Sequence, residues 1–273
     1  PCLLFTMGRE IVAGCNWRNL KPLVLVGLLA AADIGFHAEV LLAGAPNIAS
    51  RVGVAALVGL IMLIGGRIVP SFTHSFLSRM RSPQLPASFG FTDKVALMVS
   101  AVALLAWIGA PAAAATGILF ALAAIVQALR LWRWKGAYTW REPLVLILHV
   151  GYAFVPLGFL LGAISIFQPG ALMGTAALHA WTVGAVGTMT LAVMTRATRG
   201  HSGHDLRASN LTVVIYATIV AAALLRIGAG FFPEFYMVLI EAAGVAWIAA
   251  FSLFLVEYSP MLLSPRVERG GAG

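Results

Sequence analysis

Long apolar stretches alternate with short polar connectors along almost the entire chain. Eight of the stretches approach or exceed the ~20 residues that an α-helix needs to cross the hydrocarbon core of a membrane. They lie near residues 22–44, 50–68, 94–109, 112–132, 143–166, 172–195, 208–229 and 234–257. The pattern predicts an all-α fold: a polytopic membrane helix bundle with about eight transmembrane helices in one membrane domain, 1–273.

Composition supports the same class. The chain is 60% hydrophobic and 10% charged, and its mean hydropathy is +0.93. Soluble domains are about half apolar and a quarter charged. Two cysteines, Cys2 and Cys15, are too few for a disulfide framework. The sequence contains no phosphate-binding glycine loop, no GxSxG nucleophile and no CxxCH haem-attachment motif.

The basic residues fall on alternate sides of the predicted helices. Sixteen of the 18 lysine and arginine residues lie on one side, and only Arg51 and Arg226 lie on the other. Because basic connectors are retained in the cytoplasm, both ends of this chain are predicted to be cytoplasmic. Topology thus explains the net charge of +8 better than nucleic acid does. The expected partner is the lipid bilayer.

Local features refine this outline. Two prolines favour a long loop from Pro70 to Asp93, and Gly184 and Gly187 make the sixth helix thin enough for close helix packing. The chain begins at Pro1 with an apolar run rather than with the basic region of a signal peptide. We therefore expect a further part of the protein to precede it.

Four ionisable side chains from three predicted helices share one depth near the outer surface. His37, His179 and Glu241 each lie about seven residues from the outer end of a helix, or ~10 Å deep, and Glu39 is slightly shallower. Asp33 is one turn from His37 on the same face, so its carboxylate can orient the imidazole. Ionisable residues inside a membrane are costly and usually mark functional sites.

Each of these residues also has a structural interpretation. His37 or His179 alone is equally well explained as a hydrogen-bonded packing residue. Glu241 has a possible ion-pair partner in Arg226, near the outer end of the seventh helix. Glu39 points about 200° away from His37 on an ideal helix, so the two can share a ligand only if the helix is distorted.

A second group of histidines lies toward the cytoplasm. His149 is about six residues inside the fifth helix, with Tyr152 one turn further on. His74, His201 and His204 lie in or beside cytoplasmic connectors. This group is a candidate proton path or inner metal site, and the alternative for His74 and His204 is a solvated loop position.

Several long stretches resemble the NnrS family of membrane proteins. They are LHAWTVGAVGTMTLAVMTRATRGHSG (178–203), GGRIVPSFT (65–73), NWRNL (16–20), FHAEVLLAG (36–44) and LHVGYAFVPLGFLL (148–161). They occur in the family's order and extend the resemblance over essentially the whole chain, which corresponds to the C-terminal two-thirds of the family's length. The resemblance implies a haem- and copper-containing protein of a bacterial-type inner membrane. It also implies a link to denitrification, nitric oxide and nitrosative stress.

The resemblance and the depth argument meet at the same residues. The polar positions inside the matching stretches are His37, Glu39, His149, His179, Arg196 and His201. We expect haem to use His37, His179 and His149, and a metal such as copper to use His37, His179, Glu39 and His201. Asp33, Arg196 and Glu241 are expected to orient ligands or pair with anions.

Two departures from the family affect this assignment. The family's amino-terminal histidine-rich element is not in this chain, and His204 stands where the family usually has arginine. Arg196, Arg199 and His201 are suitable for a haem propionate. However, a haem near the outer surface is too far from them, which favours a structural role as a cytoplasmic anchor.

The leading hypothesis is a haem- and copper-binding membrane protein that handles nitric oxide, with a redox partner if it is an enzyme acting on nitrogen oxides. The alternative is a proton-coupled secondary transporter that uses Asp33, His37 and Glu241 as a relay. A third possibility is a scaffold whose metal ligands lie outside this chain.

Overall fold

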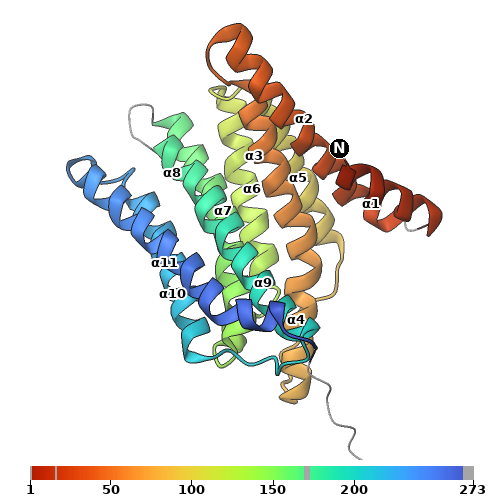
Figure 1. Cartoon of the computed structure of the whole chain (residues 1–273). Helices are drawn as coiled ribbons and strands as arrows, with labels where there is room; N and C mark the ends of the chain where they lie inside the picture. The colour runs from red at the N-terminus through yellow and green to blue at the C-terminus, as the bar shows by residue number, and fades with distance from the viewer. Residues whose placement is uncertain (1, 16, 169–172, 267–273) are drawn as a thin grey trace, which may run out of the picture.

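The chain folds into a bundle of α-helices (Figure 1). The computed structural model describes residues 2–15, 17–168 and 173–266, and no β-strand occurs among them. The helices are α1 (Cys2–Ala13), α2 (Leu20–Ala43), α3 (Ile48–Leu60), α4 (Gly66–Arg79), α5 (Phe91–Gly109), α6 (Ala114–Trp132), α7 (Pro143–Phe167), α8 (Met173–His179), α9 (Thr188–His201), α10 (Asn210–Gly228) and α11 (Tyr236–Leu263). Two π-helical segments join α3 to α4 (Ile61–Gly65) and α8 to α9 (Ala180–Gly187).

Eight helices in the described part of the chain are long and apolar enough to cross a membrane, which confirms the predicted number and fold class. Two of them run through the π-helical segments. Ile48–Arg79 is 32 residues long, and Gly174–His201 is 28. At 1.5 Å per residue the first is about 48 Å long, which exceeds the ~30 Å hydrocarbon core of a bilayer.

The predicted loop from Pro70 to Asp93 is wrong in its first half, because α4 continues through Pro70 as far as Arg79. Proline removes one backbone donor, but in membrane helices a local π adjustment can satisfy the groups that it frees. The π-helical segment Ile61–Gly65 ends just before α4, five residues ahead of Pro70. The connector that remains is the stretch 80–90.

Helix α7 forms the centre of the bundle. Of the residues in its apolar stretch, 67% are buried, compared with 6% in α2. A helix that is apolar all round is expected in such a buried position, and α7 contacts α6, α8 and α9. Helix α2 contacts mainly α3, and Figure 1 shows α1 and α2 leaning away from the other helices. The core therefore lies around α7, and α2 is peripheral.

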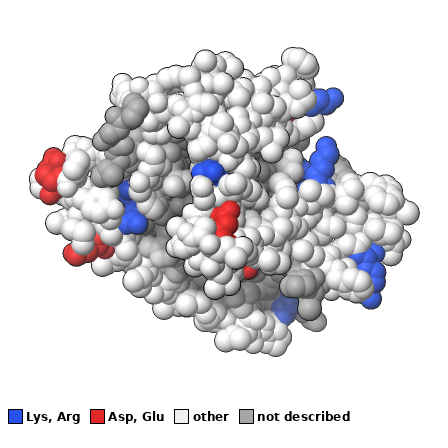
Figure 2. All heavy atoms as spheres, turned by 90° about the horizontal axis from the view of Figure 1, so that it is seen from above, with Lys and Arg blue, Asp and Glu red and all other residues white. Residues whose placement is uncertain are grey.

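The two ends of the bundle differ in charge. We call one the basic end: α4, α6 and α9 finish there with Arg79, Arg130 and Arg199 in their last turns, where cations favourably oppose the helix dipole. It lies at the bottom of Figure 1. Figure 2 shows the molecule from above, onto the opposite end, as a mostly uncharged surface with a few separate charged side chains. This end contains the α2–α3 and α10–α11 connections.

Candidate functional site

A buried ion pair links α5 and α6 near the basic end. Arg130, which is 1% exposed, donates from Nε to Oδ1 of Asp93 at 2.9 Å. Asp93 Oδ2 accepts from the backbone N–H of Gly90 at 3.0 Å and so caps the start of α5. Arg130 Nη1 donates to the Tyr152 hydroxyl at 2.8 Å and to the Met62 carbonyl in the π-helical segment at 3.1 Å.

The chain of hydrogen bonds continues toward the middle of the bundle. The Tyr152 hydroxyl donates to Oε1 of Gln127 at 2.8 Å. Gln127 Nε2 donates to the Ser100 hydroxyl at 2.9 Å and to the Ala96 carbonyl at 3.3 Å. These hydrogen bonds join α5, α6, α7 and the π-helical segment Ile61–Gly65 through buried side chains, and such polar contacts help to fix the register of helices in a core. We refer to Asp93, Arg130, Tyr152, Gln127 and Ser100 as the buried polar network.

Of the residues in this network, only Tyr152 was singled out from the sequence, as a neighbour of His149. Arg130 and Asp93 lie at the edges of apolar stretches and resemble ordinary connector charges. The signal that could have revealed the network is Gln127, a polar residue well inside the fourth stretch and fully buried in the structure. A buried amide must find partners, and the arginine one turn later is within reach of the same groups.

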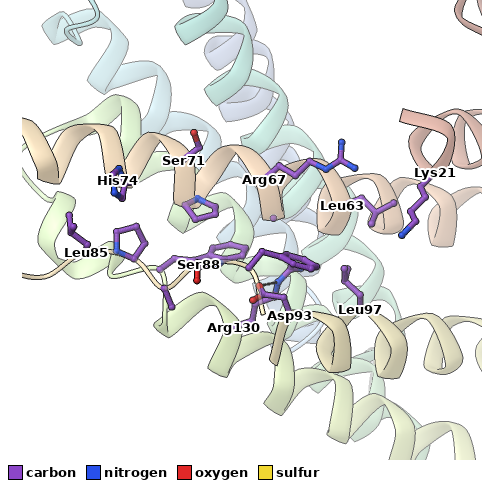
Figure 3. A pocket seen from close by; sticks show the side chains of 16 residues that line it. Lys21, Leu63, Arg67, Ser71, His74, Leu85, Ser88, Asp93, Leu97 and Arg130 are labelled. Carbon is purple, nitrogen blue, oxygen red and sulfur yellow. Dashed lines mark hydrogen bonds and ion pairs between the residues drawn. The ribbon is translucent and has the colours of Figure 1, made fainter. Parts of the chain in front are cut away.

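A cavity of about 870 Å³ lies beside this network at the basic end. Figure 3 shows Arg67, Ser71 and His74 along α4 on one wall, with Leu85 and Ser88 of the 80–90 connector facing them. Lys21, Asp93 and Arg130 also line it. Three cationic side chains and one carboxylate therefore border the cavity, and Asp93 is already paired with Arg130.

One donor at this wall has no partner. Arg130 Nη2 is buried and makes no hydrogen bond, and it lies so close to Gly66 that an added Cβ would be 2.1 Å away. Gly66 therefore has to be glycine for the guanidinium to reach its position. An unsatisfied charged donor at the edge of a cavity is a reason to look for an anion.

His149 is held as a packing residue would be. Its Nε2 lies 2.8 Å from the Thr73 hydroxyl, which itself donates to the Val69 carbonyl. The network thus assigns the proton to Nε2 and leaves Nδ1 as an acceptor. Nδ1 is buried without a partner, but an added Cβ on Gly136 would lie only 2.5 Å from it. The predicted role of His149 toward haem has no other support and stays a prediction.

His179 is paired with Arg226. Arg226 Nε donates to His179 Nε2 at 3.1 Å, and Nδ1 is buried without a partner. The π-helical segment Ala180–Gly187 begins at the next residue, and such segments often occur at functional sites. The suggested Arg226–Glu241 pair does not form among the described residues, and Glu241 is exposed. Arg226 therefore pairs with His179 and not with Glu241, although all three residues were predicted to lie toward the same end of the bundle.

His37 and Asp33 are both exposed on the peripheral helix α2. The His37 ring contacts the Phe36 ring edge-on, with centroids 5.7 Å apart. Helix α2 contacts mainly α3, whereas α8, which ends at His179, contacts α7 and α10. Within residues 2–15, 17–168 and 173–266, no three His, Cys, Asp or Glu side chains are grouped to hold one metal ion. The predicted grouping of His37, His179 and Glu39 is therefore not present in this arrangement.

Glu39 caps the next helix. Its carboxylate accepts the backbone N–H groups of Asn47, Ile48 and Ala49 at 2.5, 3.2 and 3.1 Å. These are among the first donors of α3, which have no partner inside the helix and attract negative charge. The sequence did not suggest this role, because the α2–α3 turn brings together residues eight to ten positions apart.

Replacing Glu39 with alanine should lower the free energy of unfolding by about 1 kcal/mol, because the first turn of α3 loses its acceptor. Thermal unfolding of the detergent-purified protein would measure this loss. Asp33→Ala, which removes an exposed carboxylate from the same helix, should change the stability little. A Glu39→Ala protein of unchanged stability but reduced metal content would instead restore Glu39 as a ligand.

Arg199 joins α9 to the last helix. It donates to Glu257 at 2.9 Å and to the Tyr258 hydroxyl at 3.2 Å. Glu257 also accepts from the hydroxyls of Ser209 and Thr212 at the start of α10. The cluster therefore ties three helices together at the basic end, and its charges are already matched.

Arg196 and His201 lie on the same helix. The Arg196 guanidinium stacks over the Phe72 ring of α4 at 4.1 Å. His201 is exposed at the end of α9. The role of this segment as a cytoplasmic anchor stays a prediction, and neither residue joins a cluster of metal donors among the described residues.

A family model with the description NnrS protein matches residues 1–266. No curated protein and no solved structure matches the chain. The matched range contains all eight of the apolar helices that are long enough to span a membrane. The chain therefore belongs to the NnrS family, and it is a multi-pass membrane protein of a family related to the response to nitric oxide.

Proposed function

We propose that this protein binds haem and contributes to tolerance of nitric oxide and nitrosative stress, in cells that carry out denitrification. The observation that carries the proposal is His179, a partly buried imidazole whose Nε2 accepts from Arg226 at 3.1 Å just before a π-helical segment. Ionisable groups inside a membrane are costly and by default mark functional sites. The surrounding sequence is the longest of the stretches that resemble the family.

The chemistry of His179 and Arg226 fits haem. The imidazole of His179 can bind the iron, and the guanidinium of Arg226 can pair with a propionate carboxylate. Haem iron in proteins is commonly held by histidine, and haem carries two propionate groups that arginine pairs with well. In the present arrangement Arg226 donates to Nε2, so the proton of the neutral ring is on Nδ1. Ligation through Nε2 would require Arg226 to give up this hydrogen bond, and a carboxylate is the acceptor that would draw it away.

When bound, haem would supply an iron that can bind nitric oxide. The remaining contributions come from the chain itself. His179 would fix the position of the haem, and Arg226 would pair with a propionate group. The buried side chains around α7 would exclude water. The predicted role of His37 as a second ligand has no support from its position, because it is exposed on α2, which contacts mainly α3.

Copper fits the described residues less well. A copper ion needs several imidazole, sulfur or carboxylate donors around one point. No three His, Cys, Asp or Glu side chains are close enough together in the described part of the chain, so copper is not part of the proposed function.

Changing His179 to alanine should abolish the haem absorption band of the full-length protein purified after growth with added haem. His74→Ala, which removes an exposed histidine of α4, is the matched control and should retain the band. Because Arg226 loses its acceptor in the single variant, His179→Ala with Arg226→Met serves as a second variant with no unpaired charge. Retention of haem in both His179 variants would exclude this ligand, and a wild-type protein without haem would exclude the proposal.

The transporter alternative has weaker support. Asp33, His37 and Glu241 lie on α2 and α11 as exposed side chains, and no hydrogen bond links any two of them among the described residues. A relay needs groups within hydrogen-bond reach. We further propose that the basic end faces the cytoplasm of a bacterial-type inner membrane, because 16 of the 18 basic residues lie toward one predicted side.

A further inference from the structure

We propose that this protein holds an anionic phospholipid, with the phosphate in the cavity between α4 and α5 and an acyl chain in an apolar groove that adjoins it. The groove lies between α2, α3 and α5 and has a volume of about 700 Å³. Lys21, Leu63 and Leu97 line both the groove and the cavity, so the two hollows meet at these residues. The proposal is independent of haem.

The groove has the chemistry of a lipid tail site. Its lining consists of aliphatic side chains, methionines and one glycine, and Lys21 is the only charged residue among those described that border it. Lys21 lies where the groove meets the cavity. An occupant must therefore be apolar along most of its length and negatively charged or polar at one end.

The groove is elongated, as an acyl chain requires. Along α5 the lining runs from Leu97, which also lines the cavity, to Ile108 near the opposite end of the helix, which is about 16 Å at 1.5 Å per residue. An acyl chain that starts at the cavity would thus extend along the groove toward the other end of the bundle.

The cavity has the chemistry of a phosphate site. Lys21, Arg67 and Arg130 border it, and the carboxylate of Asp93 is neutralised by Arg130. Arg130 has one donor, Nη2, that is buried without a partner, and Ser71 and Ser88 are among the other residues that line the cavity. Basic pockets between transmembrane helices at the cytoplasmic side are typical sites for anionic headgroups.

Position separates a lipid from other anions. A free phosphate would use only the cavity and leave the adjoining groove empty. A phosphatidylglycerol molecule would use both, because its charge and its tails are covalently joined and the two hollows meet at Lys21, Leu63 and Leu97. The level is also suitable, since Gly66 lies about 27 Å along the long helix from Ile48, close to the ~30 Å thickness of the hydrocarbon core.

The test is native mass spectrometry of the detergent-purified full-length protein. It is titrated with dioleoylphosphatidylglycerol, with the same chains on phosphatidylcholine, or with inorganic phosphate. We expect one phosphatidylglycerol per protein, little retained phosphatidylcholine, and no displacement of the lipid by millimolar phosphate. Equal retention of both lipids would overturn the proposal, because it would indicate non-specific annular binding. Full displacement by phosphate would also overturn it, because it would indicate a small-anion site.

Variants separate the two halves of the site. Lys21→Gln with Arg67→Gln should weaken phosphatidylglycerol binding about 30-fold, since each basic residue near a membrane contributes ~1 kcal/mol. Arg130 is left unchanged because it also holds the buried polar network. Arg141→Gln, which removes an exposed arginine outside the cavity, is the matched control.

The groove is tested with Ala101→Phe, which fills it, against Val102→Phe, which adds the same ring on an exposed position of α5 outside the lining. Only Ala101→Phe should reduce lipid retention. Loss in neither variant, or in both equally, would mean that the acyl chain does not lie in this groove and would exclude the proposal.

Discussion

Replacing Arg130 with methionine should destabilise the protein by about 3–5 kcal/mol, the loss that follows when one partner of a buried ion pair is removed. The side chains of Arg130 and Asp93 are 1% and 5% exposed, so the remaining carboxylate could not be solvated. The Tyr152 hydroxyl and the Met62 carbonyl would lose their donor at the same time.

The double variant with Arg130→Met and Asp93→Asn should be more stable than the sum of the two single changes predicts. Asparagine keeps an oxygen for the Gly90 N–H while removing the charge. Thermal or denaturant unfolding of the four proteins in detergent gives the coupling energy of the pair. Arg141→Met, which removes an exposed arginine stacked on Trp140, is the control and should have little effect. Additive losses in the cycle would contradict a buried, coupled pair.

Gly184→Ala should cost about 1–3 kcal/mol, the usual effect of adding volume to a closely packed core. An added Cβ would lie 2.5 Å from Cγ and 2.9 Å from Cβ of Phe154. Phe154 belongs to the central helix α7 and is buried, so it cannot move aside without shifting its own backbone. The close contact confirms the prediction that the glycines make the span Gly174–His201 thin enough for close helix packing.

Gly244→Ala is the matched control for this change. Gly244 also lies inside a long membrane helix, but no atom is found within 4 Å of an added Cβ. Alanine is the better helix former by up to ~1 kcal/mol, so this variant should be as stable as the wild type or more stable. Melting temperatures that fall equally in both variants would show that the cost is not steric.

The number and approximate positions of the helices could be predicted because each apolar stretch is long and bounded by polar residues. The full length of the membrane-spanning helix Ile48–Arg79 could not be predicted. Pro70 is a strong helix-breaking signal, and a π-helical turn leaves no recognisable periodicity in a single sequence, so the continuation to Arg79 was hidden.

For the residues of the candidate site, the depth in the membrane could be predicted, but the direction in which each side chain points from its helix could not. Residue counting placed His179 and Arg226 toward the same end of the bundle without indicating that they face each other. The same counting placed Glu39 beside His37, although its carboxylate turns to the start of α3. The orientation of each helix about its own axis is set by packing between helices, and a single amino-acid sequence contains little information about that packing.

The long helix Ile48–Arg79 has a mechanical consequence. Its first turn is held by Glu39 at one end of the bundle, and its last turns form a wall of the cavity at the other. A single continuous helix thus connects the Glu39 end of the bundle to the cavity at the other end. A change that tilts its first turn would also move Arg67 and the cavity wall, because no loop interrupts the helix between them.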